Sequence, residues 1–171
     1  TDLGPVIDAE AFDNIQRHVA RLRGSAKALL PEAAASQAMP NLIAPQMFEV
    51  GAIAEVTQEI FGPVLQVVRW GGEPLDVIHQ INALGYGLTL GIQTRIDSRA
   101  QALAAAARVG NVYVNRNMIG AVVGVQPFGG EGLSGTGPKA GGPNYLLRFC
   151  AEQTLTINTT AAGGNVGLMA G

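Results

Sequence analysis

The chain has 171 residues, a length that suits one domain, with 47% apolar and only 14% charged residues. Its net charge of −2 provides no basic surface for nucleic acid, and no apolar run approaches the roughly 18 residues that a membrane span needs. The single cysteine excludes an internal disulfide and suits a reducing cytoplasm. We therefore expect a cytoplasmic protein that has no membrane span and does not bind nucleic acid through this segment.

The first predicted element is an amphipathic helix that Asp8 caps and that reaches about Arg23. Its apolar residues recur at helical spacing, and charged residues occupy the other face. The apolar set is Phe12, Ile15, Val19 and Leu22. His18 lies between the two faces, and we expect a surface residue there rather than a ligand.

Two short strands are predicted next. Residues 24–40 favour a strand near 27–30, followed by a mobile, alanine-rich loop. Residues 41–50 favour a second strand. Pro45 lies within it and indicates an edge position or a bulge, because proline cannot donate a ladder hydrogen bond.

The central segment alternates between strand and helix patterns. The predicted order is strand 64–70, helix 73–84 ending at Gly85, strand 88–94, helix 99–109 capped by Ser98, and strand 111–115. The first of these strands is continuously apolar, which is typical of a strand covered on both faces. This alternation predicts an α/β fold with a parallel sheet, and Asn115 would emerge at the sheet edge where ligands gather.

A glycine-rich stretch follows at residues 127–143, with the sequence PFGGEGLSGTGPKAGGP. Glycine permits positive φ angles and lets bare N–H groups approach a ligand. Gly141 and Gly142 directly precede Pro143, which is favoured at the first position of a helix, and we expect that helix to reach about Gln153. The unpaired N–H groups and the helix dipole would suit a carboxylate or a phosphate.

Other interpretations of this stretch stay open or fail on spacing. A glycine-rich connection can be only a tight packing corner. The series Gly135-x-Gly137-x-x-Ala140 imitates a dinucleotide fingerprint, but the nearest predicted strand ends around Asn115 and no helix begins at Gly137. A Walker motif fails at Lys139, which follows a proline and precedes an alanine.

The C-terminal end is predicted to be an exposed strand and a frayed tail. Residues 154–158 (TLTIN) alternate in polarity but have no partner nearby in sequence, and such an edge is a liability unless another chain covers it. Residues 159–171 are small and glycine-rich.

Two motifs carry a family resemblance. The stretch PFGGEGLSGTGPKAGGPNYLLRF, together with EIFGPV at 59–64, resembles the aldehyde dehydrogenase superfamily. More narrowly, the similarity is to the pyrroline-5-carboxylate (glutamate semialdehyde) dehydrogenase module of bifunctional proline utilization A proteins, over essentially the whole chain. It implies that residues 1–153 are part of a parallel-sheet catalytic domain and that residues 154–171 are an oligomerisation strand with a flexible tail, which makes a homo-oligomer.

The resemblance also implies a chemistry that this segment does not complete. The family oxidises aldehydes with a cysteine thiolate, NAD and a glutamate base, and in its pattern the cysteine, the glutamate and the nucleotide-binding domain all precede the position matching Thr1. We therefore expect the C-terminal part of a longer NAD-dependent enzyme, inactive alone and working with the rest of the parent chain. If the parent is bifunctional, FAD would belong to a separate proline dehydrogenase domain.

Few site residues carry over. Glu59 and Phe61 match residues that reach the nicotinamide ribose of NAD, although from the residues alone they would read as a surface acid and a core phenylalanine. Phe128 matches an aromatic residue that lines the aldehyde tunnel, and could equally be a core residue. The loop at 140–142 matches the one that anchors the carboxylate of glutamate semialdehyde, which selects Gly141 and Gly142 as substrate-binding residues.

No catalytic or metal-ligating residue is expected in this segment. Cys150 lies within a predicted helix among apolar neighbours, without a His, a Lys or a helix N-terminus nearby to activate the thiol, and a buried structural role is expected. Glu131 has no role that the sequence assigns. Two alternatives remain: a non-catalytic oligomerisation module, and an independent small carboxylate-binding domain.

Overall fold

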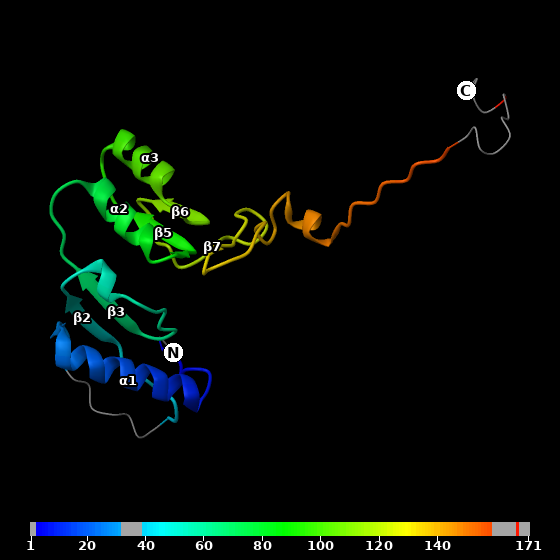
Figure 1. The fold of residues 1–171 in the computed structure, drawn as a ribbon. Coiled ribbons are helices and arrows are strands. Elements are labelled where there is room, and N and C mark those ends of the chain that lie inside the picture. Colours follow the sequence, from blue (N-terminus) through cyan, green and yellow to red (C-terminus); the bar gives the residue numbers. More distant parts are fainter. Residues whose placement is uncertain (1–2, 32–38, 159–166, 168–171) are drawn as a thin grey trace.

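A computed structural model describes residues 3–31, 39–158 and 167. Two groups of helices and strands follow one another along the chain (Figure 1). The first contains α1 (Ala9–Ser25), β1 (Lys27–Ala28), β2 (Gln46–Val50), the 3-10 helix η1 (Ile53–Glu55) and β3 (Val64–Val68). The second contains α2 (Pro74–Ala83), β4 (Tyr86–Gly87), β5 (Thr89–Ile92), α3 (Asp97–Ala106) and β6 (Asn111–Val114), followed by β7 (Glu131–Gly132) and the 3-10 helix η2 (Tyr145–Phe149). The fold is α/β, as predicted.

Helix α1 and the first sheet form the larger core. Asp8 caps the helix as predicted, since its carboxylate accepts the Ala11 N–H at 2.8 Å. The sheet has the order β1-β2-β3, in which β2 and β3 are parallel and β1 is antiparallel. The buried residues of this core are Ile15, Val19, Leu22, Ile43, Phe48 and Val50. The alanine-rich loop predicted after the first strand falls largely on residues 32–38, outside the described residues.

Two details of this sheet differ from expectation. Strand β2 begins only after Pro45, which removes the proline from the ladder altogether. Strand β3 is not covered on both faces, because Leu65 is 53% exposed while Val64 and Val68 pack toward the core under α1. Within the described residues one face of this strand therefore carries an apolar side chain without a cover.

The second group packs two helices with a parallel strand pair. Strand β5 pairs with β6 in the register Thr89↔Asn111. Gly85, at φ +80°, ends α2 as predicted. The predicted cap of α3 was wrong: the helix already begins at Asp97, with Ile96 at the N-cap and no side-chain cap bond. The turn before the helix is stabilised by Thr94 rather than by Ser98, because the Thr94 hydroxyl oxygen accepts the Ile96 N–H at 3.2 Å.

The prediction of one continuous parallel layer was also wrong. Among the described strands, β3 belongs to the sheet β1-β2-β3 and β5 pairs only with β6, so the two parallel pairs are separate. The periodicity of apolar residues predicts which side chains of a strand or helix are buried. It does not predict which two strands pair in a sheet.

The C-terminal elements are shorter than predicted. In place of a helix over residues 144–153, only the five-residue η2 forms, with no buried residue and no side-chain cap. A helix of this length needs packing to persist, and Leu146, Leu147 and Phe149 are each at least 65% exposed. Residues 154–158 form no strand in the described chain and extend away from the other elements (Figure 1). Of the tail at 159–171, only residue 167 is among the described residues.

Candidate functional site

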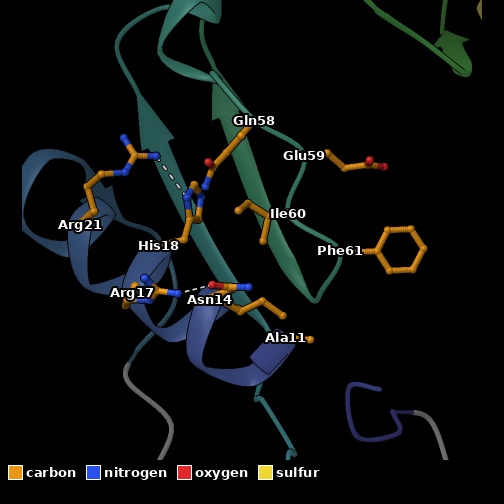
Figure 2. Close-up of a pocket in the computed structure, with 10 residues that line it drawn as sticks. Ala11, Asn14, Arg17, His18, Arg21, Gln58, Glu59, Ile60 and Phe61 are labelled. Atoms are coloured by element: carbon orange, nitrogen blue, oxygen red, sulfur yellow. Dashed lines mark hydrogen bonds between the residues drawn. The ribbon is translucent and has the colours of Figure 1, made fainter. Parts of the chain in front are cut away.

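The segment 58–61 presents its side chains alternately to two sides. Figure 2 shows Gln58 and Ile60 directed toward α1, whereas Glu59 and Phe61 point away from it. Ile60 packs against the core, while Glu59 is exposed and Phe61 is 88% exposed. The next residue, Gly62, is held close to the helix, because a Cβ there would lie 2.5 Å from Ile15 Cδ1. The core therefore fixes this backbone and leaves one carboxylate and one aromatic ring exposed.

A cavity of about 630 Å³ lies between this segment and α1. Its helix wall contains His18, which is 4% exposed and whose Nδ1 lies 3.1 Å from Arg21 Nη2 (Figure 2). The expectation of a surface histidine was therefore wrong, because residue 18 shares a helix face with the buried Ile15 and Leu22. Burial, followed by the Arg21 charge, lowers the pKa of His18 below its usual 6.5.

The base of the glycine-rich stretch is fixed to the start of β6. Asn111, 8% exposed, donates from Nδ2 to Pro127 O at 3.0 Å, and its Oδ1 accepts the Gly129 N–H at 3.3 Å. Lys139 Nζ donates to Gly110 O. Gly110 also has no room for a side chain, since a Cβ would lie 1.7 Å from Gly129 O. The two ends of the stretch are thus bound to one corner of the sheet.

Phe128 and Ala140 join the two arms of the glycine-rich stretch. The Phe128 N–H donates to Ala140 O at 3.1 Å and the Ala140 N–H donates to Phe128 O at 3.0 Å. Phe128 is half-buried, in agreement with either of its predicted roles. This bridge places residues 141 and 142 directly beyond the pair.

The two predicted anchor glycines differ in structure. Gly141 has φ +72°, is exposed, and has no atom within 4 Å of the place where a Cβ would stand. Its N–H has no hydrogen-bond partner among the described residues. The Gly142 N–H is not open as expected, because it donates to Lys139 O at 3.0 Å and closes a turn. A Cβ on Gly142 would also meet Lys139 O at 3.0 Å and Pro127 Cβ at 3.3 Å. The expected helix dipole is missing as well, because η2 is short.

Tyr86 links the segment 58–61 to the glycine-rich stretch. The Glu59 N–H donates to the Tyr86 hydroxyl oxygen at 3.3 Å, and Tyr86 pairs with Gly132 across β4 and β7. Glu131 takes part in the same pairing, opposite Gly87, through its backbone. Sequence reasoning missed Tyr86 and Asn111, and only their positions next to a glycine at a strand start hinted at a special role.

Cys150 is exposed and lies just after η2, with Sγ 3.5 Å from Leu146 O. The predicted burial was wrong because the helix expected to enclose it does not form. In the part of the chain that the structure describes, no group of three or more metal-ligating side chains occurs. Nor does any described helix have the length and apolar character of a membrane span.

The family model described as Aldehyde dehydrogenase family matches residues 1–155. The chain belongs to this family. It is 53% identical over 160 residues to the bifunctional protein PutA of Escherichia coli K12, a match that covers 90% of this chain and 12% of that protein. It is 35% identical over 159 residues to the 1-pyrroline-5-carboxylate dehydrogenase of Geobacillus kaustophilus, covering 91% of this chain and 30% of that protein.

Solved structures agree with this assignment. A crystal structure of bifunctional proline utilization A superposes with a TM-score of 0.81 at 54% identity, over 94% of this chain and 16% of that one. A Thermus 1-pyrroline-5-carboxylate dehydrogenase with bound NAD superposes with a TM-score of 0.77 at 34% identity, over 86% of this chain and 29% of that one. The chain thus spans about one eighth of the PutA relatives' length and under a third of the dehydrogenases' length.

Proposed function

We propose that this chain is part of an NAD-dependent dehydrogenase that oxidises L-glutamate γ-semialdehyde to glutamate in proline catabolism. In the overall reaction the aldehyde, water and NAD⁺ give the carboxylate, NADH and two protons. The names of the relatives support this substrate, since they are PutA and 1-pyrroline-5-carboxylate dehydrogenase proteins. The observation that carries the proposal is the outward presentation of Glu59 and Phe61 on a backbone fixed by the core.

The residues present suit the nicotinamide ribose of NAD. When NAD is bound, its nicotinamide ring accepts the hydride. Glu59 has a free carboxylate with two acceptor oxygens, which matches two neighbouring hydroxyl groups. The ring of Phe61 is 88% exposed, and an apolar ring in water gains from covering a ligand's face. Because Ile60 is packed against the core, neither side chain needs a backbone movement to meet its ligand.

The substrate's carboxylate is proposed to bind at residues 141 and 142. Gly141 offers an unpaired N–H in open space, and a hydrogen bond to a charged acceptor contributes about 1.5–3 kcal/mol. Gly142 contributes by lacking a side chain, so that the chain can turn tightly beside Pro127. Phe128, between these glycines and the sheet, would line the path of the aldehyde chain.

A longer enzyme must supply the nucleophile. Cys150 is exposed and interacts with a backbone carbonyl rather than with a base. Several large apolar side chains outside the proposed NAD contact are also left exposed, as expected of a segment that packs against the rest of an enzyme: Ile119, Val123, Val125 and Leu133. The chain alone, mixed with semialdehyde and NAD, is expected to produce no NADH, and a clear rise in NADH absorbance would contradict this.

The cofactor assignment is tested in the full-length enzyme. Glu59→Gln keeps the size of the side chain but loses its charge, and is expected to raise KM for NAD about tenfold with little change in KM for the semialdehyde. Glu73→Gln is the matched control, because Glu73 is an exposed glutamate whose side chain caps nothing. Equal KM values for NAD in the two variants would refute the role of Glu59.

We further propose that residues 154–158 pair with another subunit in a cytoplasmic homo-oligomer. Leu155 and Ile157 are 78% and 70% exposed on a segment that makes no strand pairing within the described chain. Deleting these residues from the full-length enzyme is expected to lower its molar mass in light scattering by an integral factor. An unchanged mass would refute the pairing and would leave the dehydrogenase proposal intact.

A further inference from the structure

The geometry points to Asn111 as a positioning residue for substrate selection: its side-chain amide holds the peptide groups on both sides of Phe128 and so fixes the loop that receives the substrate's carboxylate. This inference rests on the proposed function, because it concerns the same loop. It adds a buried residue that touches neither substrate nor cofactor.

The contacts of Asn111 use both ends of its amide. The Nδ2 group donates to Pro127 O at 3.0 Å, and Oδ1 accepts from the Gly129 N–H at 3.3 Å. Asn111 itself is fixed at the start of β6, where its backbone N–H donates to Leu88 O at 3.0 Å. Because the side chain is 8% exposed, water cannot readily replace these two bonds.

Asn111 restrains the loop at residues 140–142 indirectly, through the pair Phe128 and Ala140. With the peptides on either side of Phe128 held, the backbone of Phe128 itself has little freedom. Phe128 in turn exchanges two backbone hydrogen bonds with Ala140, the residue before Gly141. The position of the open Gly141 N–H is therefore set by a chain of hydrogen bonds that begins at the sheet.

No side chain other than amide-bearing ones fits this task well. One short side chain must donate to Pro127 O and accept from the Gly129 N–H at the same time. The amide of asparagine has a donor and an acceptor at a separation that matches these two peptide groups. Alanine would remove both bonds and leave Pro127 O and Gly129 N–H without partners in a half-buried corner. The loop would then sample several positions, and the carboxylate would lose its anchor while the chemistry of the aldehyde carbon remained available.

The test compares two aldehydes in the full-length enzyme. Kinetics are measured with L-glutamate γ-semialdehyde and with pentanal, which has the same number of carbons and no carboxylate. For Asn111→Ala we expect the ratio of kcat/KM values, semialdehyde over pentanal, to fall about tenfold, mainly through KM of the semialdehyde. Binding of the product L-glutamate, followed by calorimetry, is expected to weaken by a similar factor.

Asn82→Ala is the matched control. Asn82 makes the same kind of double contact, donating to Ala106 O and accepting from the Arg108 N–H, both at 2.9 Å, but it joins α2 to the turn after α3. Its loss is expected to lower stability and leave the substrate ratio unchanged. If Asn111→Ala does not fold, Asn111→Ser keeps a hydroxyl that can replace at most one of the two bonds, and is expected to lower the ratio about threefold.

The possible results distinguish failure of the positioning role of Asn111 from failure of the proposed dehydrogenase function. If the wild-type enzyme shows no preference for the semialdehyde, the carboxylate anchor itself is wrong. If the wild type prefers the semialdehyde but the folded Asn111 variant loses activity equally on both aldehydes, or behaves as Asn82→Ala does, the positioning role is overturned and the proposed function stands.

Discussion

Replacing Gly110 with alanine tests how tightly the glycine-rich stretch is seated on the sheet. The added Cβ would lie 1.7 Å from Gly129 O and 2.7 Å from the Gly129 carbonyl carbon. Both are backbone atoms, so no rotamer change can relieve the overlap. Overpacking of this kind costs about 1–3 kcal/mol, and the upper end applies here.

A smaller effect acts in the opposite direction. Exchanging glycine for alanine reduces the freedom of the unfolded chain and stabilises by about 0.4–1 kcal/mol. The net expectation for Gly110→Ala is therefore a loss of about 2 kcal/mol, with a roughly 30-fold larger population in which the stretch is open. Gly137→Ala is the control within the same stretch, since a Cβ there meets nothing within 4 Å and its φ is not positive.

The assay is limited proteolysis of the full-length enzyme, with cleavage within residues 127–143 followed by mass spectrometry. Cleavage from an open state tracks the population of that state when reclosing is fast. We expect Gly110→Ala to be cut roughly 30-fold faster than wild type and Gly137→Ala to be cut no faster. Equal rates for the two variants would show that the close approach of Gly110 to Gly129 does not hold the stretch in place.

Three further predictions concern the elements around the site. Asp8→Ala is expected to destabilise α1 by about 1 kcal/mol and Asp8→Asn to leave it nearly unchanged, measured by urea unfolding of the full-length enzyme. His18, whose pKa is lowered by burial, favours the neutral form when folded; its contribution to stability is complete above pH 6.5 and is lost as pH falls toward the folded value. His18→Gln should flatten this pH dependence, as measured by urea unfolding at several pH values. Tyr86→Phe removes the acceptor for the Glu59 N–H and is expected to raise KM for NAD about threefold in steady-state kinetics, whereas an unchanged KM would mean that this 3.3 Å contact does not position the segment.

Local features of the fold were predictable from the sequence. Asp8 has the right side chain immediately before a helical apolar pattern, and Gly85 can adopt the positive φ that ends α2. These signals act within a few residues, so a single sequence contains them. The α/β class followed from the same short-range patterns.

Features that depend on distant partners were not predictable. Leu146, Leu147 and Phe149 suggest a helix, but only packing could extend η2, and in the described chain these side chains are exposed. The burial of His18, in contrast, follows from a local pattern that was misjudged, because residue 18 shares the predicted apolar face with Ile15 and Leu22. The side chain of Asn111 bonds to Pro127 and Gly129, which lie 16 and 18 positions further along the chain, and no local pattern predicts such a contact.

The alternation along residues 58–61 separates a side chain that packs against the core from the two that are proposed to bind NAD. Ile60 and Gly62 lie against the helix and tolerate little change, because the first packs against the core and the second has no space beside Ile15. Glu59 and Phe61 stand outside that packing, so their replacement leaves the interior untouched. Libraries randomised at these two positions alone could therefore explore new ligands while the packing against α1 is kept, whereas changes at Ile60 or Gly62 would disturb that packing.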